Sequence, residues 1–557
     1  MTDTAEVLKA AGDCGRFQIW LVVLISLACP SLSFHLFSQI FMVQRVPHHC
    51  DTSWILEINP NLTKEEQLNL TIPRNTQGSY EECYMYTPVD WDLDSIRRYG
   101  LNSTEKCRDG WVYPSIKRSL KCVSFLQFDL VCDRKEQTDI SQSIFMLGLL
   151  IGAFIFGSLS DSIGRRPTTL VCLLIQGVFG IGTAFVPNFY VYVALRWAIV
   201  LTESVLTFLA TEWVGISYRP HAVIISHCWF AFGQMTLAGL AYGIRNWRML
   251  QIAGSAPVFA LFFYIWVFPE SARWLMAKGK IKDAKKLFQK AAVMNKRTIP
   301  PELLDELTPE KESKSGNILD VFRKRHLRKV TLIMSAAWFV NSLVYYGVSL
   351  NVGNFGLDIY LTQLVFGAVE IPARFSCIYL LQWFGRKKSQ SGCLLLGGIM
   401  CLIITGIPKD LPVVTTTLAV IGKFSIAASF SVSYVYSAEL FPTVVRQTGV
   451  GLCSMSARLG GIISPLIGLL GTYNSVIPMA IFGGTPVIGG ILCCLLPETR
   501  GKELQDGTEE PVETQWWVLA VRPQSLLSPS CFALLINGDR FLASLFSVIQ
   551  ATPRPDV

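Results

Sequence analysis

Two arginines and a glutamate lie inside apolar stretches of this sequence, where a charge is costly and usually functional. Arg458, in Ser454-Met-Ser-Ala-Arg458-Leu-Gly-Gly, comes about a dozen residues into one apolar run, near the middle of a spanning helix. Arg374 lies similarly deep in another run, and Glu370 precedes it by one helical turn. A guanidinium presents a planar fork that grips a carboxylate through two parallel hydrogen bonds. We therefore expect Arg458 and Arg374 to bind an anion.

A structural alternative stays open for Arg374. Residues four positions apart share one helix face, so Glu370 can neutralise Arg374 and the pair can simply lock two helices together. Arg458 has no acidic residue close to it in the sequence. The expected anion site therefore depends more on Arg458 than on Arg374.

The composition indicates which elements hold these charges. Of 557 residues, 51% are hydrophobic and 16% are charged, which is too apolar for an ordinary soluble protein of this length. The net charge of +8 does not indicate nucleic acid, because the basic residues fall in short stretches between apolar runs. We therefore expect a membrane protein in contact with lipid.

About twelve apolar runs are long enough to cross roughly 30 Å of hydrocarbon. The predicted spans are 17–42, 140–160, 168–186, 190–210, 221–243, 247–268, 330–350, 358–381, 391–408, 412–434, 446–470 and 475–496. The fold class is thus an all-α membrane protein of twelve helices, in an N-terminal half, 17–268, and a C-terminal half, 330–496. The first run is retained as a span, because it is long, contains polar residues and lacks a small-residue cleavage site before Val43.

The polar segment 43–137 has the features of an extracellular loop. It contains three N-glycosylation sequons, at Asn61, Asn69 and Asn102. It also contains five cysteines, which are Cys50, Cys83, Cys107, Cys122 and Cys132. Such a cluster indicates disulfides in an oxidising compartment, although the connectivity is open and the odd number leaves one thiol over, for which Cys122 is the candidate. No zinc-ligand spacing is present, and the cysteines in apolar runs are interpreted as small buried hydrophobes.

The cytosolic side is indicated by cations. The linker 269–329 is rich in lysine and arginine, and Lys9 and Arg16 precede the first span. By the positive-inside rule, we expect the N-terminus 1–16, the linker and the tail 497–557 to lie in the cytosol. The expected location is the plasma membrane, with the apical face of an epithelium as one candidate. A short amphipathic helix is expected around Ile281–Met294, lying either at the membrane surface or against the helix bundle.

Several motifs follow the spans at equivalent places in the two halves. Gly157-Ser-Leu-Ser-Asp161-Ser-Ile-Gly164-Arg165-Arg166 follows the second span, and Gly385-Arg386-Lys387-Lys388 follows the eighth. These loops resemble the signature of the major facilitator superfamily, and recurrence in both halves argues against simple positive-inside charge. The strings Pro269-Glu270-Ser-Ala-Arg273-Trp-Leu275, Thr211-Glu212-Trp213, Tyr436-Ser-Ala-Glu439-Leu-Phe-Pro442 and Pro497-Glu-Thr-Arg-Gly501 resemble its organic anion and cation transporter family, over residues 1 to about 505.

That resemblance implies a substrate site and gates. Anion transporters of the family carry arginine at the position of Arg458 and a cation at that of Arg374, so this chain has the anion pattern. Aromatic residues resembling the family's substrate-lining positions are Tyr345, Tyr346, Phe230, Phe430 and Tyr434, and Gln234 and Asn351 could add hydrogen bonds. Charged residues at the predicted cytosolic helix ends are expected to form salt bridges between the halves, which break during transport. These gate residues are Asp161, Arg165, Arg166, Glu212, Arg219, Glu270, Arg273, Arg386, Glu439 and Arg446.

Two features depart from the family pattern. Bulky residues follow Arg196 in the fourth span, where the superfamily often has glycine, and this puts the packing context of Arg196 in doubt. The tail after Leu504 contains Trp516, Trp517 and the apolar stretch 541–549, pieces too short and broken to span a membrane.

The expected function is secondary transport of small organic anions by alternating access, without cofactor, catalytic residue or metal. Within the family, the strings Tyr345–Leu350, Gly367–Arg374 and Gly12–Gln18 most resemble the branch associated with urate and nicotinate. Exchange against an intracellular anion is preferred over sodium coupling, because no cluster of oxygen ligands is present; proton coupling through Glu370 stays open. The alternatives are an organic cation or zwitterion carrier of the same fold, and a non-transporting receptor or scaffold. An enzyme is not expected, and the oligomeric state is not indicated.

Overall fold

The computed structural model describes residues 4–12, 15–42, 47–75, 78–114, 128–203, 213, 219–305, 318–408, 410–442, 444–474 and 476–501. Three sequence predictions fall outside this part of the chain: the leftover thiol of Cys122, the gate charge Glu212 and the tail beyond residue 501. The side chain of Arg219 is also outside it.

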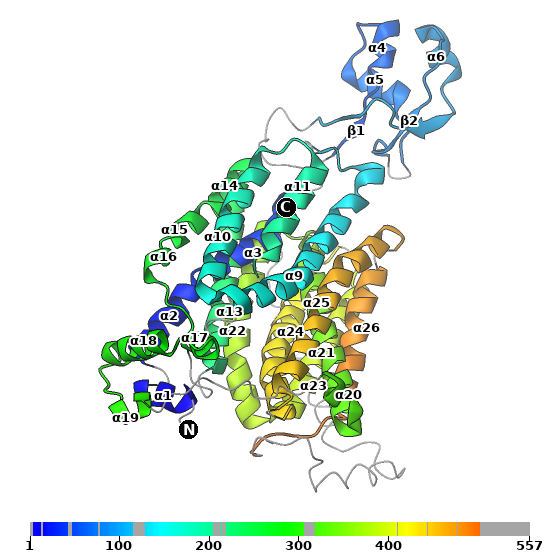
Figure 1. Ribbon diagram of the computed structural model, residues 1–557. Helices are drawn as coiled ribbons and strands as arrows, with labels where there is room; N and C mark the ends of the chain where they lie inside the picture. Colours follow the sequence, from blue (N-terminus) through cyan, green and yellow to red (C-terminus); the bar gives the residue numbers. More distant parts are fainter. Residues whose placement is uncertain are drawn as a thin grey trace, which may run out of the picture. The chain divides into compact units, whose positions relative to one another are not determined.

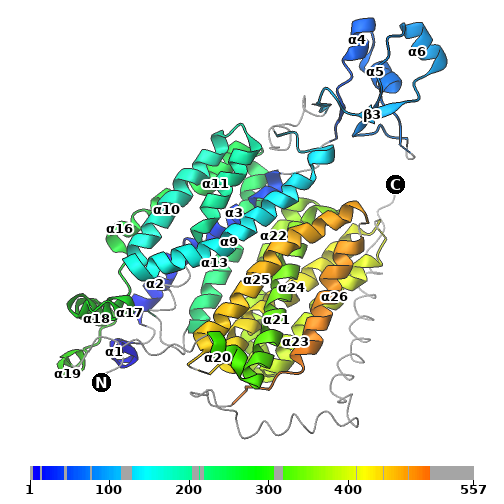
Figure 2. The same cartoon turned by 45° about the vertical axis from the view of Figure 1, so that its right-hand side comes forward.

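The N-terminal half follows the first six predicted spans, and two of these are broken by proline. Its helices are α2 (Arg16–Ser26) with α3 (Cys29–Met42), α9 (Glu136–Ile163), α10 (Arg165–Gly182), α11 (Phe189–Leu201), α13 (Arg219–Gly243), and the series α14 (Trp247–Ser255), α15 (Pro257–Leu261) and α16 (Tyr264–Val267). The breaks come just before Pro30 and Pro257, because proline lacks an N–H and its ring clashes with the preceding turn. Figures 1 and 2 show α9, α10 and α11 side by side.

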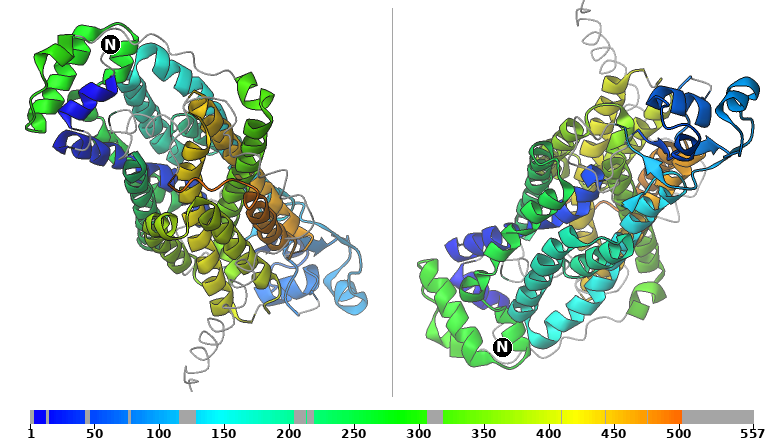
Figure 3. Two further views of the ribbon diagram at one scale, coloured as in Figure 1. Left: turned by 90° about the horizontal axis from the view of Figure 1, so that it is seen from below. Right: turned by 90° about the horizontal axis from the view of Figure 1, so that it is seen from above.

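The C-terminal half consists of six long helices, one for each predicted span. They are α21 (Arg325–Leu350), α22 (Ile359–Trp383), α23 (Arg386–Thr405), α24 (Pro412–Leu440), α25 (Arg446–Leu469) and α26 (Val476–Cys493). Both views of Figure 3 show these helices grouped together. The two halves meet where α13 packs on α22 and α9 packs on α25.

Ten helices within the described residues are long and apolar enough to cross a membrane. The two other predicted spans correspond to α11, which has 13 residues, and to the series α14–α16. The arrangement therefore agrees with twelve spans in two groups of six.

The segment between α3 and α9 forms a small domain of two short sheets. Strand β1 (His49–Cys50) pairs antiparallel with β4 (Trp111–Val112), and β2 (Tyr84–Tyr86) pairs with β3 (Thr104–Lys106). The helices α4 (Trp54–Ile58), α5 (Lys64–Thr71) and α6 (Leu93–Tyr99) complete it. Disulfides join Cys50 to Cys107 and Cys83 to Cys132, and the three sequon asparagines, Asn61, Asn69 and Asn102, are exposed. We call the end of the bundle that carries this domain the loop end.

The opposite end, the linker end, carries α17 (Ala272–Ala277), α18 (Ile281–Met294), α19 (Pro301–Asp305) and α20 (Ile318–Arg323). Helix α18 has the predicted bounds, and it buries Ala284, Phe288 and Ala291 in a core shared with α2 and α10. Of the two settings predicted for this helix, the structure therefore shows the packed one, against the bundle.

Asn295, which ends α18, fixes the start of the first span. Its Oδ1 accepts a hydrogen bond from the Phe17 backbone N–H at 2.9 Å, and its Nδ2 donates to the Ala11 carbonyl and to Gln18 Oε1. A Cβ at Gly15 would lie 2.2 Å from Asn295 Cγ, so only glycine permits this approach. Ala11, Phe17 and Gln18 thus connect the short N-terminal helix α1 (Thr4–Ala11) and α2 to the linker.

Candidate functional site

Helices α22 and α24 bring three charged side chains into the interior of the C-terminal half. Glu370 is 0% exposed, Arg374 4% and Lys423 1%. All three are held by helices that pack against each other. We call these three residues the buried charge cluster.

Glu370 lies at the centre of this cluster. Its Oε1 accepts a hydrogen bond from the Tyr345 hydroxyl at 2.6 Å and lies 2.8 Å from Lys423 Nζ. Its Oε2 lies 3.5 Å from Arg374 Nη2. One carboxylate is therefore shared by two cations, which leaves the cluster with a formal charge of one positive unit.

Arg374 uses its guanidinium to join two helices. Nη1 donates to the Ala427 carbonyl at 3.1 Å and to Ser431 Oγ at 3.0 Å, both on α24. With the Glu370 contact on its own helix, Arg374 thus ties α22 to α24. This geometry matches the structural alternative raised from the sequence, although Nε has no partner among the described residues.

Lys423 was missed in the sequence analysis. It lies 11 positions after Pro412 in an apolar run, so the same rule that selected Arg374 and Arg458 would have found it. Its ammonium also lies 3.2 Å from the centroid of the Tyr345 ring, a cation–π arrangement. What the sequence could not show is that Lys423 and Glu370, 53 positions apart, meet in space.

Arg458 has a different environment. It lies 12 positions after the start of α25, about 18 Å along the helix at 1.5 Å per residue, and it is partly exposed. Among the described residues its guanidinium makes no hydrogen bond or ion pair, but it interacts electrostatically with Tyr346 and Tyr434. Gly460, two residues after Arg458, lets α25 approach α21 closely, because a Cβ at this position would lie 2.3 Å from the Phe339 carbonyl oxygen.

Four of the five predicted aromatic residues form one ring cluster beside these arginines. Ring centroids are 5.2 Å apart for Tyr345 and Tyr346, 6.2 Å for Tyr345 and Phe430, and 5.9 Å for Phe430 and Tyr434. Trp338, which the sequence analysis missed, completes the cluster at 4.3 Å from Tyr434. Its indole N–H donates to Ser437 Oγ at 2.9 Å, so the indole has a fixed orientation.

The fifth aromatic residue, Phe230, lies in the N-terminal half, and its ring centroid lies 6.0 Å from that of Phe37. A neighbour on the same helix, His227, was not predicted, yet its ring lies 6.0 Å from Tyr434 of the other half. Gln234 is fully buried with no partner among the described residues for its amide. Asn351 donates to the Gly347 carbonyl at 2.7 Å within its own helix.

The fourth predicted span contains a third arginine, Arg196, and a carboxylate, Glu203. Arg196 is 4% exposed and donates to the His35 carbonyl at 2.9 Å and to Gln39, and its guanidinium lies over the Phe145 ring at 4.7 Å. The bulky residues after Arg196 therefore do not prevent it from packing against α3 and α9. Glu203 is 3% exposed, has no hydrogen-bond partner among the described residues, and interacts electrostatically with Arg196 and Tyr346.

At the linker end, one glutamate in each half caps the start of a helix. Glu270 Oε1 accepts from the Arg165 N–H at 2.8 Å, and Glu498 Oε1 accepts from the Arg386 N–H at 2.8 Å. The residues before these arginines, Gly164 and Gly385, have φ of +114° and +81°, a region that favours glycine. Glu498 is thus the counterpart of Glu270, and the same cap is repeated in the two halves. Glu498 belongs to the Pro497–Gly501 motif, but it was not among the predicted gate residues.

The ion pairs found at the linker end lie within each half. Arg386 holds Glu439 with two nitrogens, Nε at 2.8 Å from Oε2 and Nη2 at 2.8 Å from Oε1, and Arg165 pairs with Asp161 at 2.5 Å. Among the described residues no salt bridge of the predicted gate charges crosses between the halves. The reason is that each motif folds back on the helix ends of its own half. Arg166 donates its N–H to Glu270, and Arg446 donates from Nε to the Phe441 carbonyl at 3.2 Å, while Arg273 is the second residue of the short helix α17.

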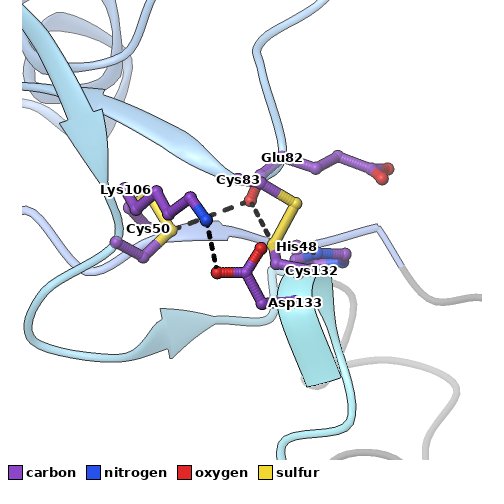
Figure 4. Close-up of a disulfide and its surroundings, with 8 residues drawn as sticks. His48, Cys50, Glu82, Cys83, Lys106, Cys132 and Asp133 are labelled. Carbon is purple, nitrogen blue, oxygen red and sulfur yellow. Dashed lines mark hydrogen bonds and ion pairs between the residues drawn. A yellow bond between two sulfur atoms is a disulfide. The ribbon is translucent and has the colours of Figure 1, made fainter. Parts of the chain in front are cut away.

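One group of metal-ligand residue types occurs in the described part of the chain: His48, Cys83 and Cys132 at the loop end. Figure 4 shows the two sulfurs joined as a disulfide, with His48 beside Cys132 and Lys106 reaching Asp133. Sulfurs in a disulfide do not act as thiolate ligands. This group therefore serves as a covalent tie between the loop domain and the start of α9.

Comparison with known proteins gives a consistent result. The family described as "Sugar (and other) transporter" matches residues 90–510. The chain is 52% identical over 517 residues to "Solute carrier family 22 member 13" from Homo sapiens, covering 92% of this chain and 93% of the relative. It is 37% identical over 524 residues to "Solute carrier family 22 member 6-B" from Xenopus laevis, with 91% and 94% covered. The fold is similar to a partially occluded inward-open structure of the xylose transporter XylE from E. coli, with TM-score 0.59, 15% identity, and coverage of 88% of this chain and 100% of that one.

Proposed function

This protein belongs to solute carrier family 22, transporters of organic ions with the twelve-helix major facilitator fold, and we propose that it carries small organic anions, with Arg458 as the residue that binds the substrate carboxylate. The observation that carries this proposal is that Arg458 is a central cation whose hydrogen bonds are not used within the described residues. A guanidinium in this setting keeps its donors for a ligand.

The charge balance supports an anion. The buried charge cluster has two cations and one carboxylate, and Arg458 adds a third cation in the same half. A surplus of positive charge in a low-dielectric region attracts anions and disfavours cations. Arg374 and Lys423 contribute to this surplus while they hold α22, α24 and α21 in place.

The rings beside Arg458 suit a flat substrate. Tyr346 and Tyr434 interact with the guanidinium, and both belong to the ring cluster with Tyr345, Phe430 and Trp338. Aromatic faces and edges pack well against flat heteroaromatic acids. Monocarboxylates such as nicotinate, and the urate anion, have this combination of a flat ring and one negative charge. Phe230 would complete the lining from the other half.

The proposed cycle is alternating access with exchange of anions. An entering monoanion would neutralise Arg458, and a leaving intracellular anion would do the same in the opposite conformation, so that the empty, charged site does not cross the membrane. The proposed orientation places the loop domain outside the cell, where its sequons carry glycans and its disulfides persist, and both termini in the cytosol. The gate charges at the linker end, including Glu270 and Glu439, would then face the cytosol.

The test is uptake of labelled nicotinate, urate and tetraethylammonium by cells that express the wild-type chain or Arg458→Asp, normalised to protein at the surface. Anion uptake should be present in the wild type and absent in the variant. The matched control is Arg297→Asp, the same change at an exposed linker residue, which should transport normally. Preloading the cells with unlabelled anion should increase uptake; no increase would contradict exchange.

A second candidate is favoured by Glu203. A buried carboxylate without a hydrogen-bond partner among the described residues, in electrostatic contact with Tyr346, could bind the cationic group of a zwitterion or an organic cation. Uptake of tetraethylammonium that Glu203→Gln abolishes, with anion uptake absent from the wild type, would establish this candidate in place of the first.

A further inference from the structure

At the loop end, two aromatic residues and an arginine of the N-terminal half surround Tyr360, which lies near the start of α22 in the C-terminal half. The Arg245 guanidinium, just after α13, donates from Nη1 to the Tyr360 hydroxyl at 2.8 Å and lies over its ring, 4.6 Å from the centroid. Phe41, near the end of α3, stacks on the same ring at 5.3 Å with an interplanar angle of 17°. Tyr242 contacts it edge-on at 5.9 Å. Tyr360 thus comes from one half and the three residues around it from the other.

The packing fixes the position of the Tyr360 ring. Phe41 is fully buried and Tyr360 is 8% exposed, whereas Arg245 is exposed at the rim. The backbone before the ring is held as well, because Asp358 caps α22 by accepting from the Tyr360 N–H at 2.8 Å and from the Leu361 N–H at 3.0 Å. A side chain anchored in this way moves with α22, so it cannot stay with Arg245 and Phe41 when the halves separate.

This contact differs from the polar contacts at the linker end. Among the hydrogen bonds that the described residues make with one another, Arg245 to Tyr360 is the one that joins the two halves. At the linker end the ion pairs stay within a half, as in Arg386 with Glu439. A contact that opens and closes during alternating access must join the two halves.

We propose that Tyr360, clasped by Arg245 and Phe41, closes the substrate path at the loop end, and that this clasp must open for substrate to enter from that side. The inference rests on the proposed orientation, with the loop domain outside the cell. The clasp consists of the Phe41 stack, the cation–π contact of Arg245 and the hydrogen bond from Arg245 to the Tyr360 hydroxyl, and these contacts stabilise the closed state.

Accessibility of Cys228 measures the clasp directly. Cys228 lies on α13, partly exposed, in electrostatic contact with Arg374 and Glu370 near the centre of the protein. A membrane-impermeant methanethiosulfonate reagent added outside intact cells reaches this thiol only when the loop end is open. Labelling is compared with that of the same protein carrying Cys228→Ser, so that modification of other cysteines is subtracted.

The expected result is graded. Tyr360→Ala should increase the rate of Cys228 labelling about tenfold, the ratio that follows from weakening the closed state by 1.4 kcal/mol. Tyr360→Phe and Arg245→Gln, which remove the hydrogen bond and keep the Tyr360 ring stack on Phe41, should increase it less. Tyr473→Phe, the same hydroxyl deletion at a residue that is 85% exposed near the loop end, is the matched control and should have no effect.

The outcome that overturns the proposal is an unchanged labelling rate in Tyr360→Ala and Arg245→Gln at equal surface level. Arg245→Gln, at an exposed position, keeps the test decisive if Tyr360→Ala does not reach the surface. Because labelling requires no substrate, faster labelling without any anion uptake would support the clasp and contradict the proposed function. Normal anion uptake with unchanged labelling would support the proposed function and contradict the clasp.

Discussion

Arg374 and Arg458 carry the same group in the same half of the molecule, yet their surroundings differ. Arg374 is almost fully buried, shares the Glu370 carboxylate with Lys423 and donates to two groups of α24. Arg458 is partly exposed and makes no hydrogen bond or ion pair within the described residues. The difference teaches that a charge in a membrane helix has at least two uses. A guanidinium whose donors are occupied holds helices together, and one whose donors are unused can bind a ligand.

The largest effect is expected from breaking the buried charge cluster. Glu370→Gln leaves Lys423 and Arg374 buried without their carboxylate, and removal of one partner of a buried pair costs about 3–5 kcal/mol. We expect a large loss of surface protein and a lower melting temperature in detergent. The double variant Glu370→Gln/Lys423→Met removes one charge of each sign and should recover part of both. Surface levels equal to wild type in the single variant would contradict this account of the cluster.

The next effect separates the two arginines. Arg458→Lys keeps the charge but loses the fork, and a hydrogen bond to a charged group contributes about 1.5–3 kcal/mol, so KM for the anion should rise about tenfold or more at an unchanged surface level. Arg374→Lys should instead lower surface protein, because it loses contacts with Ala427 and Ser431, with less change in KM. Concentration-dependent uptake with surface biotinylation measures both quantities. If Arg458→Lys lowered surface protein and Arg374→Lys raised KM instead, the roles of the two residues would be exchanged.

A smaller effect is expected from the pair at the linker end. Glu439 and Arg386 are 21% and 23% exposed, and Thr499 donates to Glu439 at 2.6 Å. Reversal of the charge in Glu439→Lys should lower the transport rate severalfold, since a partly exposed pair contributes only about 1 kcal/mol, without loss of surface expression. The exchange variant Glu439→Arg/Arg386→Glu should restore part of the rate. Unchanged uptake by Glu439→Lys at equal surface level would count against a role in gating.

The smallest effect is expected in the loop domain. Lys106 and Asp133 lie 2.8 Å apart, but their side chains are 62% and 70% exposed, and solvent screens such pairs. Lys106→Met should therefore change neither the melting temperature nor anion uptake measurably. The nearby Cys83–Cys132 disulfide provides the contrast: Cys83→Ser/Cys132→Ser should lower surface protein, because it removes the covalent tie to α9. A clear loss in Lys106→Met would show that a surface pair matters more here than its exposure predicts.

Much of the fold could be predicted because the signals are local. The lengths of the apolar runs and the Gly-Arg turns at Gly164 and Gly385 each act within a few residues. The breaks at Pro30 and Pro257 were not predicted, although their signal is equally local. The bounds of α18 agreed with its pattern of lysines and apolar residues for the same reason. The pairing of Glu439 with Arg386 within one half could not be predicted, because the sequence contains both charges but not the direction in which each motif folds. The role of these charges in gating stays a prediction.

The sequence alone determined the twelve spans, their grouping into two halves, and the presence of arginines in apolar helices, since hydrophobicity and charge are properties of single residues and short windows. Only the tertiary structure decided what each charge does. Lys423 meets Glu370 across 53 positions, Arg245 meets Tyr360 across 115, and Arg458 is left without a described hydrogen-bond partner. Such outcomes depend on which helices pack together and at what rotation, and that is set by the sum of many contacts across the bundle rather than by the residues around any one position.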